Sequence, residues 1–335
     1  ARMSCGKIHV FKYSGPSMGF FGKKIGRLVL VVLAVTALTF LMVNLLPGDV
    51  ADMIGGRGAS PEDIEAIRKD LGLDRNILVR FVSWLGDLLK GDLGKSYLTQ
   101  EPVLHIILTR LPVTVELLVI SQIFALLLAL PAGIFCAYRS GTFIDRLISI
   151  GSFATLSVPS FVMALVGIYL FAIQLHWLPA TGYTSFEYGF WANIQSFILP
   201  ALSIALIEWV VLMRVLRSDM ISTLQQNYIL MARAKGLPPW KVLLHHALRP
   251  SSFTLVTILG LQIGRLLGGA VIIETIFALP GIGRLLVNSI YARDYMVVQG
   301  CILLITIGYV VINTMVDILY HILDPRIRTE PANVS

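Results

Sequence analysis

The segment ARAKGLPPWKVLLHHALRP (232–250) separates two long apolar runs, FILPALSIALIEWVVLM (197–213) and SSFTLVTILGLQIGRLLGGAVII (251–273). It contains basic residues, a glycine and two consecutive prolines, and glycine and proline are residues that end or redirect helices. Each flanking run is about as long as a helix that crosses a bilayer. The pattern predicts two membrane helices joined by a sharply folded basic connection.

The composition of the whole chain agrees with a membrane protein. Of its 335 residues, 56% are hydrophobic and 14% are charged, and the mean hydropathy is +0.78. Soluble domains carry about 25% charged residues, so this chain has too few to coat a soluble core of its size. Six apolar runs reach the roughly 20 residues that a spanning helix needs; they are 25–46, 113–138, 147–173, 196–217, 251–273 and 296–320. We therefore expect an all-α polytopic membrane protein with six transmembrane helices, the second, third and fourth of them kinked at Pro131, Pro159 and Pro200.

The positions of Lys and Arg predict how the chain lies in the membrane. Sixteen of the 27 basic residues lie in the first 27 residues, the 139–146 loop, the 214–250 loop and the tail after Asp324. Because loops rich in Lys and Arg remain in the cytoplasm, both termini and the 232–250 segment are expected there. The net charge of +7 is explained by this topology, and nucleic-acid binding is not expected.

The predicted spans divide the chain into five segments. These are a cytoplasmic N-terminal segment (1–23), a first span (24–46), a large helical extracytoplasmic loop (47–112), a core with the other five spans (113–322) and a cytoplasmic tail (323–335). Residues 1–17 precede Met18, an ordinary start site, and are interpreted as an extension. Within the core, residues 218–250 form the predicted cytoplasmic loop.

The outer loop has helical order of its own. Ser60-Pro61-Glu62-Asp63 is a capping-box pattern with proline at the first helical position, and Gly72 is expected to end that helix. A second, amphipathic helix is expected at about 76–90. The two helices are interpreted either as a cap on the membrane helices or as a docking surface for an extracytoplasmic partner.

The string GDLGKS (91–96) has a superficial likeness to a phosphate-binding P-loop. That motif requires a glycine at the position of Leu89, and the segment is expected outside the cytoplasm, so no ATP site is predicted. No other P-loop pattern occurs in the sequence. If the protein does ATP-driven work, the ATPase is another chain.

Residues 232–250 are interpreted as part of a helix–turn–helix. Residues 221–235 suit a first helix, which Gly236 ends in a left-handed conformation. Pro238 and Pro239 cannot continue that helix but can begin a second, short one with four residues on roughly one face; these are Trp240, Leu243, Leu244 and Ala247.

Patterns for catalysis and metal binding are missing from the sequence. No nucleophile–base pair, carboxylate dyad or metal-ligand cluster stands at useful spacing, so no catalytic residue and no metal site are predicted. Adjacent His245 and His246 would point about 100° apart on a helix, without an acidic or thiol partner at ligand spacing. Cys5, Cys136 and Cys301 are far apart and are interpreted as small buried hydrophobes.

The segment YILMARAKGLPPWKVLLHHALRP (228–250) resembles the cytoplasmic "EAA" coupling loop of ABC importer permeases, in their dipeptide/oligopeptide/nickel branch. The resemblance covers residues 24–328 and rests on further strings in the family's order. These are LPGD (46–49), LGLD (71–74), GDLGKS (91–96), SVPSF (157–161), LPATGY (178–183), ILPALSIA (198–205), LGLQIGRLLGGAVIIETIFALPGIGRLLVNSIYARDY (259–295) and LDPRIR (323–328). Each short string is weak evidence, but their order and positions together are specific.

The resemblance implies a permease subunit in the plasma or inner membrane of a bacterium or archaeon, surrounded by membrane lipid. Such a permease pairs with a second, homologous permease subunit and receives cargo from an extracytoplasmic substrate-binding protein. Two cytoplasmic ABC ATPase subunits bind ATP and Mg²⁺, so this chain needs no cofactor. By residue-by-residue match, the implied ATPase-coupling positions are Ala232, Arg233, Ala234, Lys235, Gly236 and Pro239.

Three positions depart from the broader family pattern. Leu230 stands where the pattern has the glutamate that names the loop, Met231 replaces its second alanine, and its Leu-Pro reads Leu248-Arg249. Contacts assigned to that glutamate cannot be transferred to this chain. The Ala-Arg-Ala-Lys-Gly core is therefore expected to make the contact with the ATPase.

Polar residues within the apolar runs are a second group of candidates. Ionisable groups there cost at least about 2.5 kcal/mol when exposed to lipid, so they usually face a pore or a partner. Helix register brings Arg265 within reach of Glu116 or Glu208, which leaves an interhelix ion pair and a pore lining as alternatives. The translocation-path or interhelix candidates are Glu116, Glu208, Gln262, Arg265 and Glu274, with Asn313 and Asp317 as weaker ones.

The element FALPGIGRLLVNSI (277–290) is short, apolar and broken, and it is expected at the outer mouth. Its Pro280, Gly281 and Gly283 are candidates for an outer gate, and a simple plug is the alternative.

The substrate remains open at this stage. Similar permeases carry dipeptides, longer peptides, nickel complexes and other small solutes. Dipeptide or oligopeptide import is the leading interpretation, and import of nickel or a metal chelate through the same architecture is the alternative. A secondary transporter is a more distant one, because the repeated half-sequences expected for it are not found.

Overall fold

The computed structural model describes residues 18–45, 50–56 and 59–323. Within these ranges the regular secondary structure is helical, apart from an isolated antiparallel bridge between Lys95 and Pro102. Two π-helical segments (Ile168–Gln174 and Val242–Ala247) and a 3₁₀ turn (Phe186–Tyr188) accompany the α-helices. The α-helices are α1 (Met18–Leu45), α2 (Val50–Gly55), α3 (Pro61–Asp70), α4 (Ile77–Leu89), α5 (Val103–Tyr138), α6 (Phe143–Leu156), α7 (Ser160–Gly167), α8 (Phe190–Leu224), α9 (Asn227–Ala234), α10 (Pro239–Lys241), α11 (Leu248–Gly269), α12 (Val271–Ile276), α13 (Ile282–Tyr291) and α14 (Tyr295–Leu323).

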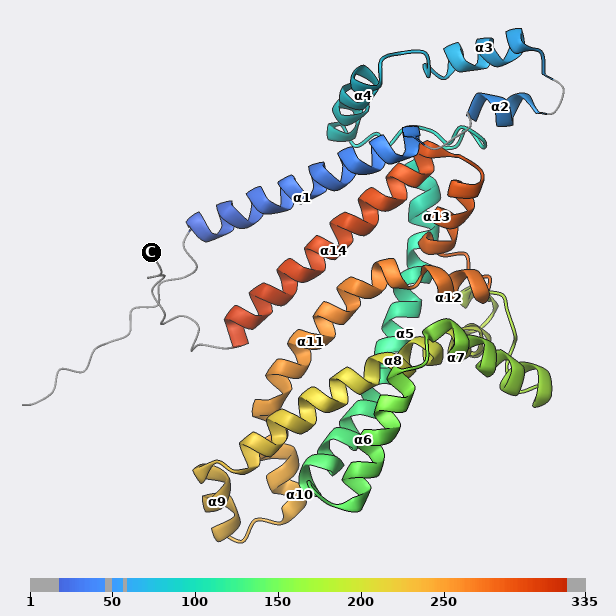
Figure 1. The fold of residues 1–335 in the computed structure, drawn as a ribbon. Coiled ribbons are helices and arrows are strands. Elements are labelled where there is room, and N and C mark those ends of the chain that lie inside the picture. The colour runs from blue at the N-terminus through green and yellow to red at the C-terminus, as the bar shows by residue number, and fades with distance from the viewer. Residues whose placement is uncertain (1–17, 46–49, 57–58, 324–335) are drawn as a thin grey trace, which may run out of the picture.

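Helices α5 and α8 form the centre of the molecule. They pack against each other, α11 packs against α8 and α14, and α1 packs on α14 (Figure 1). At Gly133 of α5 an added Cβ would lie 3.0 Å from the Leu216 side chain and 3.2 Å from the Met213 carbonyl of α8. Small residues at such positions let membrane helices approach closely and gain packing contacts. The α5–α8 pair is therefore the frame on which the other helices are placed.

The molecule has two distinct ends. Helices α2–α4 and the loop leading to α5 lie together at one end, and we call the described residues 50–56 and 59–102 the cap (Figure 1). At the opposite end α8 turns through α9 into α10, and we call residues 225–241 the elbow. Helix α1 begins, and α14 ends, away from the cap (Figure 1).

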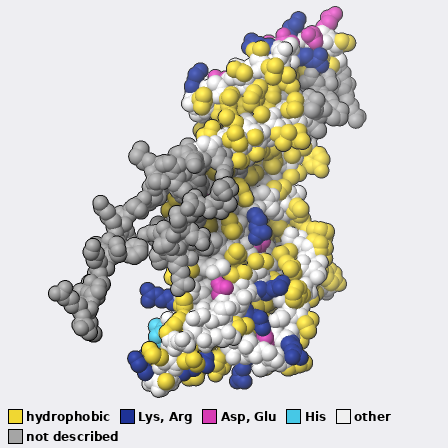
Figure 2. Space-filling view, turned by 60° about the vertical axis from the view of Figure 1, so that its left-hand side comes forward, with side chains coloured by type: hydrophobic (Ala, Val, Ile, Leu, Met, Phe, Trp, Pro, Cys, Tyr) yellow, Lys and Arg dark blue, Asp and Glu magenta, His cyan; other side chains and the backbone are white. Residues whose placement is uncertain are grey.

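Several helices are suited to a membrane. Among the described residues, four are long and apolar enough to cross one, and the bent pair α6–α7 makes a fifth if it counts as one span. Helix α1 has 28 residues, with an apolar stretch from Leu28 to Met42. Figure 2 shows charged side chains near the cap and across the opposite half of the visible face, with a largely apolar band between these two regions. The chain is therefore a multi-pass, all-helical membrane protein, while the count of six spans and their orientation stay predictions.

The third predicted span differs from its expected form. Residues 147–173 were expected as one kinked helix, but α6 and the helix from Ser160 to Gln174 meet at 96°. Pro159 stands directly before α7 and cannot donate the hydrogen bond that would continue α6. The Ser157 hydroxyl donates instead to the Phe153 carbonyl (2.9 Å) at the end of α6. The run is thus divided into two separate helices, and the prediction of a simple kink was wrong.

Helices α5 and α8 are longer than the apolar runs that predict them. They have 36 and 35 residues, or roughly 54 and 52 Å at 1.5 Å per residue, against a hydrocarbon layer of about 30 Å. Residues 103–112 and 218–220, for which no helix was predicted, are helical. Hydropathy marks where lipid contact begins, and a helix can continue into water beyond that point.

The cap has the helix ends that its sequence predicts. The Ser60 hydroxyl accepts from the Asp63 N–H (3.2 Å), and the Asp63 carboxylate accepts from the Ser60 N–H (3.1 Å). These hydrogen bonds with Ser60 lower the pKa of Asp63. Gly72 adopts φ +63° after α3, and Asn76 caps α4 by accepting from the Leu78 N–H (2.9 Å).

The GDLGKS segment fastens the cap to α14. Asp294, which is 4% exposed, accepts from the Ser96 hydroxyl and from the Tyr97 N–H (3.2 Å). The Val103 N–H donates to the Gly94 carbonyl (3.0 Å), which leads the chain into α5. In this chain the segment is a structural connection between distant parts of the sequence.

Candidate functional site

The elbow is a compact reversal between two long helices. Helix α8 ends at Leu224, α9 occupies Asn227–Ala234, and Gly236 takes φ +76°. This confirms the left-handed stop predicted at Gly236. The predicted single helix over 221–235 was wrong, because the chain breaks at Gln225–Gln226 between α8 and α9.

The second arm of the elbow runs directly into a membrane helix. Residues from Pro239 to Gly269 form one continuous helical stretch of 31 residues, with a π-helical section at Val242–Ala247. A separate short helix with one apolar face was expected there. Trp240 is 58% exposed and Leu244 is 45% exposed, whereas Ala247 is buried, so the expected common face is wrong. The elbow is therefore joined to the following span without a flexible linker.

The implied coupling residues differ in accessibility. Ala232 is 8% exposed and belongs to the buried side of α9, next to fully buried Ile229. The other five positions are exposed; they are Arg233, Ala234, Lys235, Gly236 and Pro239. Exposed apolar side chains accompany them, among them Tyr228, Leu230 and Met231. The elbow thus presents basic and apolar groups together on an accessible surface.

A hollow of about 550 Å³ lies beside the elbow, lined by Tyr138, Arg139, Leu224, Arg233, Leu237, Pro239, Val242 and Leu243. It brings the end of α5 next to both arms of the elbow. The Thr223 and Ser251 hydroxyls are 3.2 Å apart, which adds a polar contact between α8 and α11. Displacement of the elbow would therefore act on three helices.

An ion pair that the sequence analysis missed supports this end of the molecule. Arg217 of α8 donates two hydrogen bonds to Asp145 of α6, from Nε to Oδ1 (2.8 Å) and from Nη2 to Oδ2 (2.7 Å). Asp145 is 2% exposed and also accepts from the Gly141 N–H (2.9 Å). The sequence did contain a sign of Asp145. Thr142 and Asp145 stand three residues apart, which is a helix-start pattern, and they do so in an otherwise basic loop.

The membrane-depth candidate Glu274 is a fully buried connection between helices. Its Oε1 accepts from the Thr114 hydroxyl of α5 (2.6 Å), and its Oε2 accepts from the Arg284 N–H (3.0 Å). The Thr114 hydroxyl accepts in turn from the Ile282 N–H (2.9 Å). N–H groups in the first turn of a helix lack partners within the helix. Glu274 and Thr114 supply those partners and hold the start of α13 against α5.

The outer-gate candidates lie in the turn around Glu274, which we call the closed turn (277–283). An added Cβ at Gly281 would overlap the Glu274 carboxylate, and one at Gly283 would lie 2.6 Å from the Val271 Cα. Pro280 is half-buried in the same turn. The Phe277 carbonyl accepts from the Gly182 N–H (2.8 Å), which joins the 178–183 segment to the turn. A gating role of these residues stays a prediction.

The remaining polar candidates on the long helices have different surroundings. No salt bridge within 4 Å joins Arg265 to Glu116 or Glu208 in the described part of the chain, although Arg265 and Glu208 interact electrostatically. Gln262 is fully buried and donates to the Glu208 backbone carbonyl (3.1 Å), which joins α11 to α8. Arg265 is exposed near the C-terminal end of α11, four residues before Gly269.

The weaker candidates lie on α14, where Asn313 is half-buried with its Oδ1 next to the position of an added Cβ at Gly264 (3.4 Å), and Asp317 is exposed. Groups of three or more His, Cys, Asp or Glu residues able to hold a metal ion are not found among the described residues.

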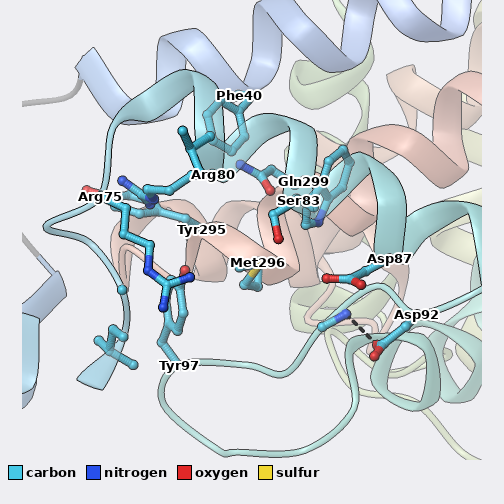
Figure 3. Close-up of a pocket in the computed structure, with 15 residues that line it drawn as sticks. Phe40, Arg75, Arg80, Ser83, Asp87, Asp92, Tyr97, Tyr295, Met296 and Gln299 are labelled. Carbon is cyan, nitrogen blue, oxygen red and sulfur yellow. Dashed lines mark hydrogen bonds between the residues drawn. The ribbon is translucent and has the colours of Figure 1, made fainter. Parts of the chain in front are cut away.

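The cap contains a pocket of about 180 Å³ between α4, the GDLGKS loop and the start of α14 (Figure 3). Figure 3 shows Arg75 and Arg80 on one side of it and Asp87 and Asp92 on the other. Burial raises the pKa of the Tyr97 hydroxyl at this pocket, and Arg80 opposes that rise. The pocket could not be predicted from the sequence, because its residues come from segments that only the fold brings together.

Two family models match this chain, one over its N-terminal part and one over the rest. The family model "Binding-protein-dependent transport system inner membrane component" matches residues 129–329, and the corresponding N-terminal family model matches residues 18–118. A Brucella abortus protein named as a peptide transport system permease protein is 42% identical over 306 residues, which cover 91% of this chain and 98% of that protein.

Two further relatives have more specific names. The Di/tripeptide transport system permease protein DppB of Pseudomonas aeruginosa is 37% identical and covers 93% of this chain and 99% of its own length. The Glutathione transport system permease protein GsiC of Escherichia coli O6:H1 is 36% identical, with 91% and 97% covered. Together with the apolar helices and the elbow, these matches show that the chain belongs to the family of binding-protein-dependent transport system inner membrane components, the permeases of ABC importers.

Proposed function

We propose that the chain forms half of the translocation pathway of an ATP-driven importer of dipeptides and oligopeptides in the inner membrane. A second, homologous permease subunit supplies the other half, and an extracytoplasmic substrate-binding protein delivers the peptide. Two cytoplasmic ATPase subunits bind ATP and Mg²⁺ and act through residues 228–250. The names of the relatives, which refer to peptide, di/tripeptide and glutathione transport, favour peptide cargo.

The accessible elbow is the observation that carries this proposal. Arg233, Ala234 and Lys235 are exposed at the end of α9, while Ile229 and Ala232 attach that helix to the rest of the molecule. Small and basic residues on a fixed support suit a cleft with an acidic rim in a partner. Because the elbow continues directly into α11, movement of the partner would be transmitted to the membrane helices.

The exposure of Arg265 supports the placement of a translocation path along α11. A charged side chain costs at least about 2.5 kcal/mol when it faces lipid at the bilayer centre. Arg265 is exposed and forms no salt bridge with Glu208 or Glu116 in the described part of the structure. We infer that this face of α11 is turned toward the water-filled path or toward the second permease subunit.

The substitution Gly236→Pro tests the coupling role. Proline fixes φ near −65°, whereas Gly236 has φ +76°, so the elbow cannot keep its shape. We expect the chain to insert normally and ATP-dependent uptake of a radiolabelled dipeptide to fall to background in cells that contain the complete transporter. The amount of chain in the membrane is measured by immunoblot in the same cells.

Gly91→Pro is the matched control, because Gly91 has a similar φ of +83° with open space around it but lies in the cap. We expect Gly91→Pro to leave the coupling of ATP hydrolysis to uptake intact, even if the amount of protein falls. Full uptake by the Gly236→Pro variant would refute the coupling assignment.

A further inference from the structure

The cap pocket is lined by basic side chains on one side and acidic side chains on the other, which distinguishes it from an ordinary gap in the packing. Arg75 and Arg80 lie on one side, and Asp87 and Asp92 lie on the other (Figure 3). Asp92 is fixed in place because its Oδ1 accepts from the Gly94 N–H (2.8 Å). A ligand with a negative group at one end and a positive group at the other would complement both sides.

Two polar atoms of residues that line the pocket have no hydrogen-bond partner among the residues that the structure describes. They are the Nε1 of Trp84, which can only donate, and the Oε1 of Gln299, which can only accept. The two residues are 6% and 5% exposed, and a buried polar group without a partner costs roughly 1–3 kcal/mol. Gln299 lies between the arginines and the aspartates in Figure 3. A ligand with both an N–H and a carbonyl group in its middle would satisfy these two atoms.

We propose that the cap pocket binds a short zwitterionic peptide, with its carboxylate at Arg75 and Arg80 and its ammonium group at Asp87 and Asp92. The peptide group between them would accept from Trp84 and donate to Gln299. Guanidinium groups suit carboxylates because they can donate two parallel hydrogen bonds. This inference rests on the proposed function, and it adds a peptide site in the cap, away from α11.

The size of the pocket restricts the ligand. Its volume is about 180 Å³, below the roughly 300–1,000 Å³ of sites for drug-sized ligands. An extended dipeptide spans about 7 Å. The pocket therefore suits a dipeptide, whereas a longer peptide would have to leave through its open side.

The test is direct binding of L-alanyl-L-alanine to the purified transporter in lipid nanodiscs, without the substrate-binding protein, by titration calorimetry. Three analogues each lack one feature: the amide lacks the carboxylate, the N-acetyl peptide lacks the ammonium group, and the ester L-alanyl-L-lactate lacks the peptide N–H. We expect each analogue to bind at least tenfold more weakly than the dipeptide. Equal binding of all four compounds would overturn the proposal.

Substitutions of single pocket residues identify which side chain recognises each group of the dipeptide. Arg75→Gln is expected to weaken dipeptide binding about tenfold and to remove the preference over the amide. Gln299→Leu is expected to remove the preference over the ester. Arg68→Gln on α3 is the matched control, because Arg68 lies outside the pocket and pairs with Glu65 on the surface (3.4 Å), and it should bind like the parent.

Failure of this inference can be told apart from failure of the proposed function. A transporter that takes up the dipeptide but shows no binding in the cap pocket refutes the inference alone. If Arg75→Gln weakens binding of the substrate-binding protein and leaves peptide binding unchanged, the pocket is a protein-docking site and the inference is also refuted. A transporter that binds the dipeptide with the expected preferences, but does not take it up, supports the inference and refutes the proposed function.

Discussion

The elbow and the closed turn both use glycine and proline to reverse the chain between helices, but for different physical reasons. In the elbow, Gly236 has φ +76° and open space around it, so glycine is needed for its backbone conformation. In the closed turn, Gly281 has an ordinary extended backbone, and glycine is needed because the Glu274 carboxylate occupies the space of a side chain. The comparison teaches that an exposed turn is free to bind a partner, whereas a buried turn is fixed by its neighbours.

The largest expected effect is that of Gly281→Ala. The added Cβ would displace the Glu274 carboxylate from its hydrogen bonds, and overpacking of this kind costs about 3 kcal/mol. Gly236→Ala should cost about 1 kcal/mol, since it strains only the backbone. Thermal unfolding of both purified variants in detergent measures the difference. Equal losses would show that the two turns do not differ as described.

The next effect isolates the polar connection of the closed turn. Thr114→Val keeps the side-chain shape but removes the hydroxyl that donates to Glu274 and accepts from the Ile282 N–H. We expect a loss of about 2 kcal/mol of unfolding free energy. Thr109→Val on the same helix is the control, because its exposed hydroxyl bonds only to the Ile106 carbonyl in the described structure (2.8 Å). Similar losses from both variants would argue against a special role of Thr114.

A smaller effect is expected for a charge reversal in the elbow. Lys235→Glu should leave thermal stability unchanged, since Lys235 is exposed, and lower peptide-stimulated ATP hydrolysis about tenfold, or about 1.4 kcal/mol of coupling. Lys241→Glu, also exposed but outside the Ala-Arg-Ala-Lys-Gly core, is the control. If the two reversals lower ATP hydrolysis equally, the loss comes from the changed net charge of the elbow. The Ala-Arg-Ala-Lys-Gly core then makes no specific contact with the ATPase.

The smallest effect concerns an exposed helix start, which is the counterpart of the buried start of α13. Hydrogen bonds with Ser60 lower the pKa of Asp63, so the stabilisation of α3 is complete above the pKa of the unfolded chain. It is lost as the pH falls through the lower folded pKa. Hydrogen exchange of residues 61–70 should therefore accelerate at acidic pH, and Ser60→Ala should remove most of that dependence. Acceleration that Ser60→Ala leaves unchanged would contradict this explanation.

Local sequence patterns predicted those features that depend on neighbouring residues. The capping box at Ser60, the stop at Gly236 and the apolar character of the long helices follow from residues within one or two turns. The 96° break at Pro159 was underestimated, because a proline's effect depends on whether neighbouring helices continue the path. Helix lengths were also underestimated, since charge and hydropathy describe the surroundings of a helix and leave its ends undetermined.

Contacts between distant segments could not be predicted in the same way. The bonds of Glu274 to Thr114 and of Asp145 to Arg217 each join residues far apart in sequence. Sequence reasoning identified Glu274 as an unusual buried charge, but it could not name its partner. For Arg265 it left Glu116 and Glu208 open as partners, and neither carboxylate lies within 4 Å of its guanidinium in the described structure. Pairing of this kind depends on the rotation of helices about their axes, which a single sequence specifies only weakly.

The length of α5 has a mechanical consequence. This helix is unbroken from Val103, beside the GDLGKS loop, to Tyr138, which lines the hollow at the elbow. A rod of roughly 54 Å that tilts by about 10° moves one end by about 9 Å relative to the other. Helix α5 can therefore act as a lever: a small rotation set by events on the cap would arrive at the elbow as a displacement larger than one turn of helix.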